Sequence, residues 1–182
     1  MQYTTWYPSP LGQILLASDG AELTGLWFEG QKYFARGLET VHEEKNTPVF
    51  DAAKRWLDLY FSGRRPDFTP PLRLCGTPFQ QTVWKLLQTI PYGETTSYGK
   101  LALRAAGKTG AAGSSARAVG SAVARNPISI FIPCHRAVGA NGNLTGYAGG
   151  IERKISLLKL EGAYRETFFI PPAVKIKGDI RP

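Results

Sequence analysis

The sequence predicts a mixed α/β (α+β) protein, with an antiparallel β-sheet and one helix near the N-terminus and a mostly helical C-terminal lobe. Three observations support this: short apolar runs separated by turn residues, later segments with helical periodicity, and a polar, proline-rich connector at 64–71. The connector divides the chain into a lobe at 1–74, a lobe at 75–165 and a basic tail at 166–182.

The first lobe opens with three short apolar runs divided by turn-forming residues. The runs cover 3–7, 13–17 and 23–28. This spacing is typical of an antiparallel β-meander. Apolar residues then recur at spacings of three and four within 49–61, and Gly63 follows. We therefore expect an amphipathic helix that ends at this glycine.

The second lobe opens with a helix-start signal. Residues 77–80 form a capping box with proline at the first helical position, and apolar residues line one face as far as Ile90. Pro91, Tyr92 and Gly93 end this helix. Ser97 is then placed to cap a second, shorter helix.

A third helix is predicted after a glycine-rich turn at 107–114. Ser115 caps it, and residues 116–124 are nearly all small, with Arg117 as the one bulky polar side chain. Helix, turn and small helix together form a helix-turn-helix pattern. Small residues suit a helix that enters a DNA groove, and they equally suit a tightly packed core helix.

The excess positive charge lies in the C-terminal part. Residues 1–74 carry 8 Lys and Arg against 9 Asp and Glu, whereas residues 75–182 carry 14 against 5, so the net charge of +8 comes from the second part. A lobe that binds nucleic acid shows this asymmetry, although a solubilising surface does too.

Composition excludes several other classes of protein. No apolar stretch approaches the roughly 20 residues of a membrane span, and no signal peptide pattern opens the chain, so we expect a cytoplasmic protein without membrane contact. Two cysteines and two histidines, widely separated, predict neither a disulfide framework nor a metal site.

The candidate nucleophile is Cys134. It follows the apolar, β-prone run 128–132, which predicts a buried strand or segment that Pro133 halts, and it precedes His135 and Arg136. An isolated buried cysteine is inert, whereas one beside a cation or hydrogen-bond relay can become a thiolate. The relay can be a direct contact with His135 or can pass through water.

Two further features complete the candidate site. Glu161, one of five acids in the basic part, is a candidate for orienting His135, and the alternative is a solvated residue at a helix end. The glycine-rich segment 141–150 cannot form a regular helix. It can bring backbone N–H and C=O groups close to a flat ligand.

In order along the chain, these residues resemble the O6-alkylguanine-DNA alkyltransferases, also called methylated-DNA–protein-cysteine methyltransferases. The resemblance covers about 85 residues of the second lobe. It rests on Thr77-Pro78-Phe79-Gln80, Ile90-Pro91-Tyr92-Gly93, Ser97-Tyr98, Ala116-Arg117-Ala118-Val119-Gly120, Asn126-Pro127, Ile132-Pro133-Cys134-His135-Arg136, Gly146-Tyr147-Ala148-Gly149-Gly150, Lys154, Leu157-Leu158 and Glu161-Gly162.

The resemblance implies irreversible transfer of an alkyl group from O6-alkylguanine to Cys134, once per protein molecule. It implies that His135 activates Cys134 through water and that Glu161 orients His135. By the same resemblance, Asn126 holds the active-site turn and Tyr98 donates a proton or hydrogen bond to the leaving base. No cofactor or metal is expected, the N-terminal lobe should be ribonuclease H-like, and the helix-turn-helix should be winged-helix-like.

The implied partner is double-stranded DNA that contains O6-alkylguanine, bound by a monomer. The target base must be flipped out of the duplex, and the recognition helix enters the minor groove. Arg117 fills the vacated place in the base stack. The remaining DNA contacts are assigned to Ser115, Ala116, Tyr98 and Arg136. The base pocket is assigned to Ala137, Tyr147, Ala148 and Gly149, with backbone groups of Cys134 and of the first three reading the guanine.

The sequence departs from the family pattern in a few places. Ala137 replaces the usual valine, and Ala148 stands where some members have serine, but both roles are assigned to backbone groups. The turn 107–114 is longer than is typical and lies beside the DNA, so affinity or site preference can differ. The basic residues Arg165, Lys175, Lys177 and Arg181 either touch DNA or solubilise the chain.

Two other classes of function share parts of this pattern. A Cys-His hydrolase also needs an activated thiol, but it lacks a supporting motif, and Arg117 in a basic lobe disfavours it. A non-catalytic binder is the second alternative, as a helix-turn-helix regulator or an alkyltransferase-like protein that flags damage. In alkyltransferase-like proteins the nucleophile is replaced, whereas Cys134 is present here.

Overall fold

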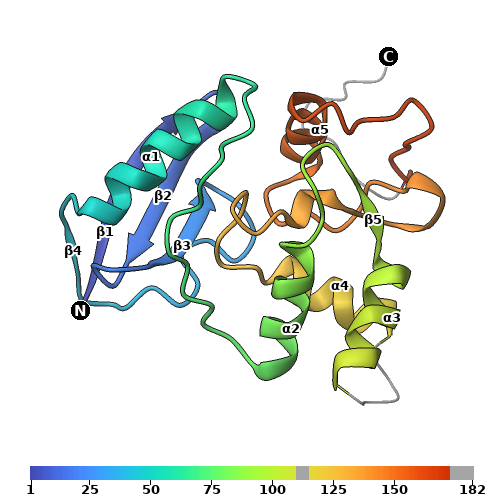
Figure 1. Ribbon diagram of the computed structural model, residues 1–182, viewed down its shortest axis with the longest axis horizontal. Coiled ribbons are helices and arrows are strands. Elements are labelled where there is room, and N and C mark those ends of the chain that lie inside the picture. Colours follow the sequence, from blue (N-terminus) through green and yellow to red (C-terminus); the bar gives the residue numbers. More distant parts are fainter. Residues whose placement is uncertain (110–114, 173–182) are drawn as a thin grey trace.

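The computed structural model describes residues 1–109 and 115–172, and its N-terminal part is built on a four-stranded sheet (Figure 1). The strands lie in the order β3-β2-β1-β4. They are β1 (Gln2–Ser9), β2 (Gly12–Ser18), β3 (Leu23–Phe28) and β4 (His42–Glu44). The first three are antiparallel, so the predicted meander is confirmed. Strand β4 pairs parallel to β1 and was not predicted, because its three polar residues are all exposed.

Both faces of this sheet are covered. Helix α1 (Pro48–Phe61) packs on one face and buries six residues, among them Phe50 and Leu57. The helix ends before Gly63, whose φ of +80° suits glycine, as predicted. On the other face, Trp27 is buried with Ala35 and Leu38 of the following loop packed against its cluster.

The second lobe is mostly helical, as the sequence predicts. Its elements are α2 (Pro78–Leu87), β5 (Thr96–Ser97), α3 (Tyr98–Thr109), α4 (Ala116–Ala124), a 3₁₀ turn η1 (Cys134–Arg136), β6 (Ala137–Val138), a second 3₁₀ turn η2 (Ala140–Gly142) and α5 (Ile151–Leu160). Strands β5 and β6 pair in parallel. The capping box at Thr77 and the cap at Ser115 are both formed. The predicted long turn lies partly outside the described residues, at 110–114, as do 173–182 of the basic tail.

The segment before Cys134 and the start of α5 complete the second lobe. The apolar run 128–132 is fully buried but is a turning segment with isolated bridges rather than a regular strand, and Ile130 has a φ of +71°. A β-branched residue rarely adopts this conformation, so packing on all sides holds it there. Helix α5 begins directly after Gly150, where the glycine-rich segment ends.

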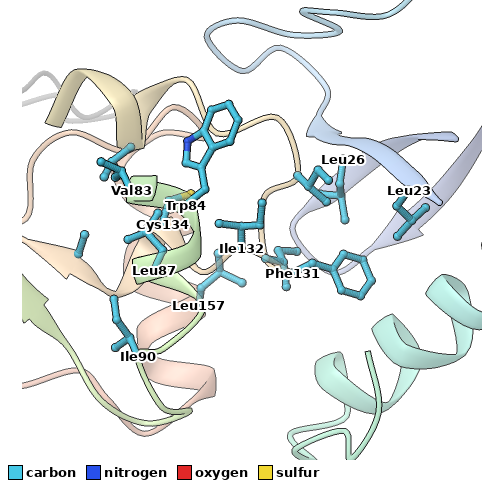
Figure 2. Packing of buried hydrophobic residues seen from close by; sticks show 14 of the residues in the cluster. Leu23, Leu26, Val83, Trp84, Leu87, Ile90, Phe131, Ile132, Cys134 and Leu157 are labelled. Carbon is cyan, nitrogen blue, oxygen red and sulfur yellow. The ribbon is translucent and has the colours of Figure 1, made fainter. Parts of the chain in front are cut away.

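One hydrophobic core joins the two lobes. Edge strand β3 hydrogen-bonds the segment that leads to Cys134, through Leu26 N to Pro127 O (2.8 Å) and Ser129 N to Leu26 O (3.2 Å). Figure 2 shows Phe131 and Ile132 lying between Leu26 of the sheet and the side chains of the second lobe. The first lobe therefore forms one wall of the region around Cys134. Within the described ranges, the helices are too short or too polar to span a lipid bilayer.

The small-residue helix α4 is held in place by Trp84 of α2. The indole is almost fully buried, and its Nε1–H donates to Ala122 O of α4 at 2.9 Å. The residues of α4 are small, and burial of this indole together with its hydrogen bond stabilises the contact between the two helices. Trp84 thereby sets the position of the helix that follows the turn.

We predict that Trp84→Phe lowers the free energy of unfolding by about 2 kcal/mol, because the hydrogen bond is lost and a small cavity forms at the α2–α4 contact. Urea denaturation followed by circular dichroism measures the change. Leu103→Ala is the control, since Leu103 is 77% exposed and its removal should change stability little. Equal losses in the two variants would contradict the assigned role of Trp84.

Candidate active site

Asn126 organises the backbone around Cys134. Its Nδ2 donates to Ile132 O (2.7 Å) and to Cys134 Sγ (3.1 Å), and its Oδ1 accepts from Ile128 N (3.0 Å). These partners leave one orientation of the amide, because the side that faces Ile132 O must donate and the side that faces Ile128 N must accept. A single buried side chain thus closes the turn at 126–132 and places a donor on the sulfur.

Cys134 lies at the end of this turn and begins η1. It is 4% exposed. Burial raises the pKa of the thiol, and the hydrogen bond from Asn126 and the charge of Lys154 partly oppose the increase. At neutral pH the resting form is therefore the thiol, so a nucleophilic thiolate requires a nearby base that accepts its proton.

His135 and Glu161 are paired next to the thiol. His135 Nε2 lies 2.6 Å from Glu161 Oε1, and the structure leaves neither side chain exposed to solvent. Burial lowers the pKa of His135, so the imidazole is neutral at rest. Because the carboxylate accepts, Nε2 carries the hydrogen and Nδ1 is the basic nitrogen. Nδ1 is buried and has no hydrogen-bond partner among the described residues.

Burial alone would raise the pKa of Glu161, but its hydrogen bonds and charge interactions with His135 and Arg136 lower this pKa to about 2. Arg136 Nε donates to Oε2 at 2.8 Å, and Nη2 donates to Oε1 at 3.0 Å. The carboxylate is consequently ionised throughout the neutral range. It can stabilise a positive charge when His135 accepts a proton.

Arg136, which is predicted to contact DNA, is largely engaged inside the protein in this structure. Its guanidinium points into the protein, where it binds Glu161 and donates through Nη1 to Ile90 O at 2.6 Å. The side chain is only 11% exposed. In this position Arg136 holds the carboxylate of Glu161 through two of its donors.

Lys154 is a site residue that the sequence reasoning did not assign. Its Nζ is buried and donates to Ala137 O (2.6 Å) and Thr145 O (3.0 Å). Burial lowers its pKa to about 8, so the ammonium form still predominates at pH 7 and its charge acts on Cys134. The signal was present in the sequence, since Lys154 falls on the buried face of α5 with Ile151 and Leu158.

Tyr98 at the start of α3 lies close to the same site. Its hydroxyl donates to Thr145 O at 3.1 Å, and burial, followed by the charge of Cys134, raises its pKa above the ordinary value. The phenol is therefore protonated at neutral pH and can donate. Gly146 permits this close approach, because a Cβ there would lie 2.8 Å from the Tyr98 hydroxyl and the φ of +82° disfavours other residues.

The residues predicted to form the base pocket come from two segments. Ala137 and Gly149 are buried, whereas Tyr147 and Ala148 are half-buried. The backbone groups are partly engaged, because Ala137 N donates to Cys134 O and Ala148 O accepts from Lys32 N of the first lobe at 3.0 Å. The first lobe therefore holds the glycine-rich loop through a backbone hydrogen bond.

The exposed face of α4 carries the residues predicted to meet DNA. Ser115, Ala116 and Arg117 are all exposed at the start of this helix, and a Cβ at Gly120 would meet nothing within 4 Å. A small, open helix face with one long cation suits close approach to a groove. Within residues 1–109 and 115–172, His, Cys, Asp and Glu nowhere form a cluster of three that could hold a metal.

Together these features define a class of protein: a helix-turn-helix protein whose buried cysteine is served by a neutral histidine and an ionised glutamate. Comparison with known families gives the particular one. Residues 78–163 match the DNA-binding domain of 6-O-methylguanine DNA methyltransferases, and residues 2–74 match the ribonuclease-like domain of the same proteins.

Curated relatives agree with this assignment. The chain is 48% identical over 153 residues to the methylated-DNA–protein-cysteine methyltransferase of Mycobacterium leprae, covering 84% of the chain and 88% of the relative. It is 45% identical to the constitutive enzyme of Bacillus subtilis, covering 91% and 99%. A crystal structure of Mycobacterium tuberculosis OGT in complex with DNA matches with a TM-score of 0.75 at 46% identity, over 89% and 92%. The chain belongs to the 6-O-methylguanine DNA methyltransferase family.

We predict that Asn126→Asp raises the pKa of the Cys134 thiol by about one unit or more, because an N–H donor to the sulfur becomes a carboxylate. The ultraviolet absorbance of the thiolate is titrated in a Cys75→Ser background, so that only Cys134 contributes. Asn141→Asp is the control, since it adds the same charge at an exposed position. An unchanged titration in Asn126→Asp would contradict the role of its amide.

Proposed function

We propose that this protein repairs DNA by transferring the alkyl group of O6-alkylguanine irreversibly to Cys134. The observation that carries the proposal is the buried Cys134–His135–Glu161 arrangement in a member of this family, beside a small-residue helix. Relatives at 44–48% identity are methylated-DNA–protein-cysteine methyltransferases. The protein acts as a methylated-DNA–protein-cysteine S-methyltransferase with a single turnover.

The reaction begins when the thiol proton of Cys134 passes through a water molecule to Nδ1 of His135. Glu161 stabilises the resulting imidazolium, because its carboxylate is ionised and accepts the hydrogen of Nε2. The nearby ammonium of Lys154 stabilises the thiolate. The base is therefore made stronger, and the nucleophile more acidic, by charges that are already in position.

The sulfur then attacks the alkyl carbon from the side opposite O6. The C–O6 bond breaks as the C–S bond forms, and the electron pair stays with the guanine. Tyr98, a protonated phenol, donates a hydrogen bond or proton to the leaving base. The proton that His135 accepted from Cys134 balances this transfer, so the guanine leaves neutral and the imidazole is neutral again. The product is a thioether, which does not react further with a neutral imidazole, so each molecule acts once.

The target base reaches Cys134 by leaving the duplex, which costs a few kcal/mol. We propose that α4 approaches the minor groove, that Arg117 takes the place of the flipped base, and that Ser115 and Ala116 lie against the backbone. Ala137, Tyr147, Ala148 and Gly149 form the base pocket, with Ala148 offering its N–H because its carbonyl is engaged by Lys32.

We further propose that the chain works as a cytoplasmic monomer on double-stranded DNA, without cofactor or metal. Its lobes at 1–74 and 75–165 share one core, and the tail at 166–182 adds positive charge. Binding should weaken as salt increases, since phosphate contacts release counterions.

We predict that the intact protein, incubated with a duplex containing O6-methylguanine, gains one methyl group on the peptide that contains Cys134. Mass spectrometry of the whole chain and of its peptides measures the gain. Cys134→Ser should gain nothing, whereas Cys75→Ser should react as the wild type does, because Cys75 is exposed and is not part of the buried Cys134–His135–Glu161 arrangement. A folded wild-type protein that binds the duplex without gaining mass would instead be a non-catalytic damage binder.

We predict that Arg117→Ala slows repair of duplex DNA at least about tenfold while changing the reaction with free O6-benzylguanine by less than about twofold, because only the duplex requires a flipped base to be replaced. Rates are compared on both substrates. Lys100→Ala, which removes another exposed cation from the same lobe, is the control. Equal losses on both substrates would refute this role of Arg117.

A further inference from the structure

Tyr60 brings the first lobe into contact with the catalytic pair. It lies on α1, is fully buried, and its hydroxyl donates to Glu161 Oε1 at 2.6 Å. The same hydroxyl lies 3.5 Å from His135 Nε2, which shares that carboxylate oxygen. Arg136 Nη2 also donates to this oxygen, at 3.0 Å, so Tyr60 of the first lobe shares it with two donors of the second lobe.

The ring of Tyr60 and its hydroxyl have separable functions. The ring packs against Trp56, with centroids 5.1 Å apart, and against Phe61 and Tyr92 at 5.4 and 6.2 Å. A phenylalanine would make the same ring contacts. The hydroxyl adds nothing to this apolar packing, and burying it is costly unless it is hydrogen-bonded. The hydrogen bond to Glu161 therefore explains why a hydroxyl is buried at this position.

We propose that Tyr60 is a positioning residue for the alkyl transfer. By donating to Glu161 Oε1, its hydroxyl weakens the hydrogen bond that this oxygen accepts from His135 Nε2. Tyr60 thereby sets the pH at which His135 can accept the Cys134 proton. This inference rests on the proposed function. It makes the first lobe a contributor to the chemistry as well as a structural support.

Several other groups face the His135–Glu161 pair and share in its titration. They are Arg136 on η1, Cys134 on the same turn, Lys154 on α5, Tyr92 in the turn after α2, and Tyr147 in the glycine-rich loop. None of these groups is altered when Tyr60 loses its hydroxyl. A shift in the pH profile of that variant therefore reports on the hydrogen bond to Glu161.

The direction of the shift follows from the competition. Without the hydroxyl, Oε1 carries more negative charge and accepts more strongly from His135 Nε2. The protonated imidazole is then favoured, so the pKa of His135 increases. Since His135 must be neutral to act as a base, the acid limb of the rate profile moves to higher pH.

The test is Tyr60→Phe, assayed with free O6-benzylguanine across the pH range so that DNA binding does not enter. Removing one of the donors that share Oε1 should move the acid limb up by about half to one unit, equal to a rate about three- to tenfold lower on that limb. An acid limb that stays in place would overturn the proposal.

Tyr7→Phe is the matched control. Tyr7 also donates from a tyrosine hydroxyl to a carboxylate, Asp58 Oδ1 at 2.7 Å, but this pair includes neither His135 nor Glu161. Its loss should leave the profile unchanged. If both variants shift the limb equally, the effect is a general loss of stability and the proposal fails.

A second measurement does not depend on alkyl transfer. The chain has two histidines, so NMR titration of the imidazole resonances, assigned with His42→Gln, follows His135 directly. The pKa of His135 should increase in Tyr60→Phe, and an unchanged value overturns the inference even if the wild type proves unreactive. In the unmodified protein, the Tyr60 hydroxyl should give a slowly exchanging, downfield proton resonance, and its absence would also count against the proposal.

Discussion

The structure of the site depends on the carboxylate of Glu161. Its two oxygens accept from His135 and Arg136 of η1 and from Tyr60 of α1, so three segments distant in sequence meet at one buried charge. Leaving such a charge unpaired would cost several kcal/mol, and removing one partner would leave buried charge without full compensation. Because the carboxylate stays ionised, it also determines which nitrogen of His135 is basic.

This arrangement explains why the two lobes form one unit. Strand β3 hydrogen-bonds the segment at 127–129, the core is continuous across the junction, and a backbone N–H of Lys32 supports the loop at Ala148. Each contact fixes backbone near Cys134 rather than at the outer surface. A lobe without a nucleophile or a helix-turn-helix can therefore influence reactivity, because the geometry of a buried polar network depends on every element that contributes to it.

The sequence predicts those parts of the molecule that local rules determine. Caps at Thr77 and Ser115 and the periodicity of α1 located the helices, and the order of motifs located Cys134 and His135. Side-chain direction was not predictable in the same way. Arg136 follows His135 directly, yet it points inward because Glu161 lies there, and this depends on how α5 packs against η1. Strand β4 was missed because its polar residues pair through the backbone alone.

Lys154 and Tyr60 show a further limit of prediction from the sequence, and the charges around the site explain why the resting thiol is a weak nucleophile. Each looks like an ordinary helix residue until tertiary packing places its polar end beside the reacting groups. Burial raises the pKa of Cys134 and lowers that of His135, so both are neutral at rest. Proton transfer creates a thiolate and an imidazolium together, between the preset charges of Lys154 and Glu161. This arrangement suits a thiol that reacts only once, because the thiol stays protonated and unreactive until the alkylated base is bound.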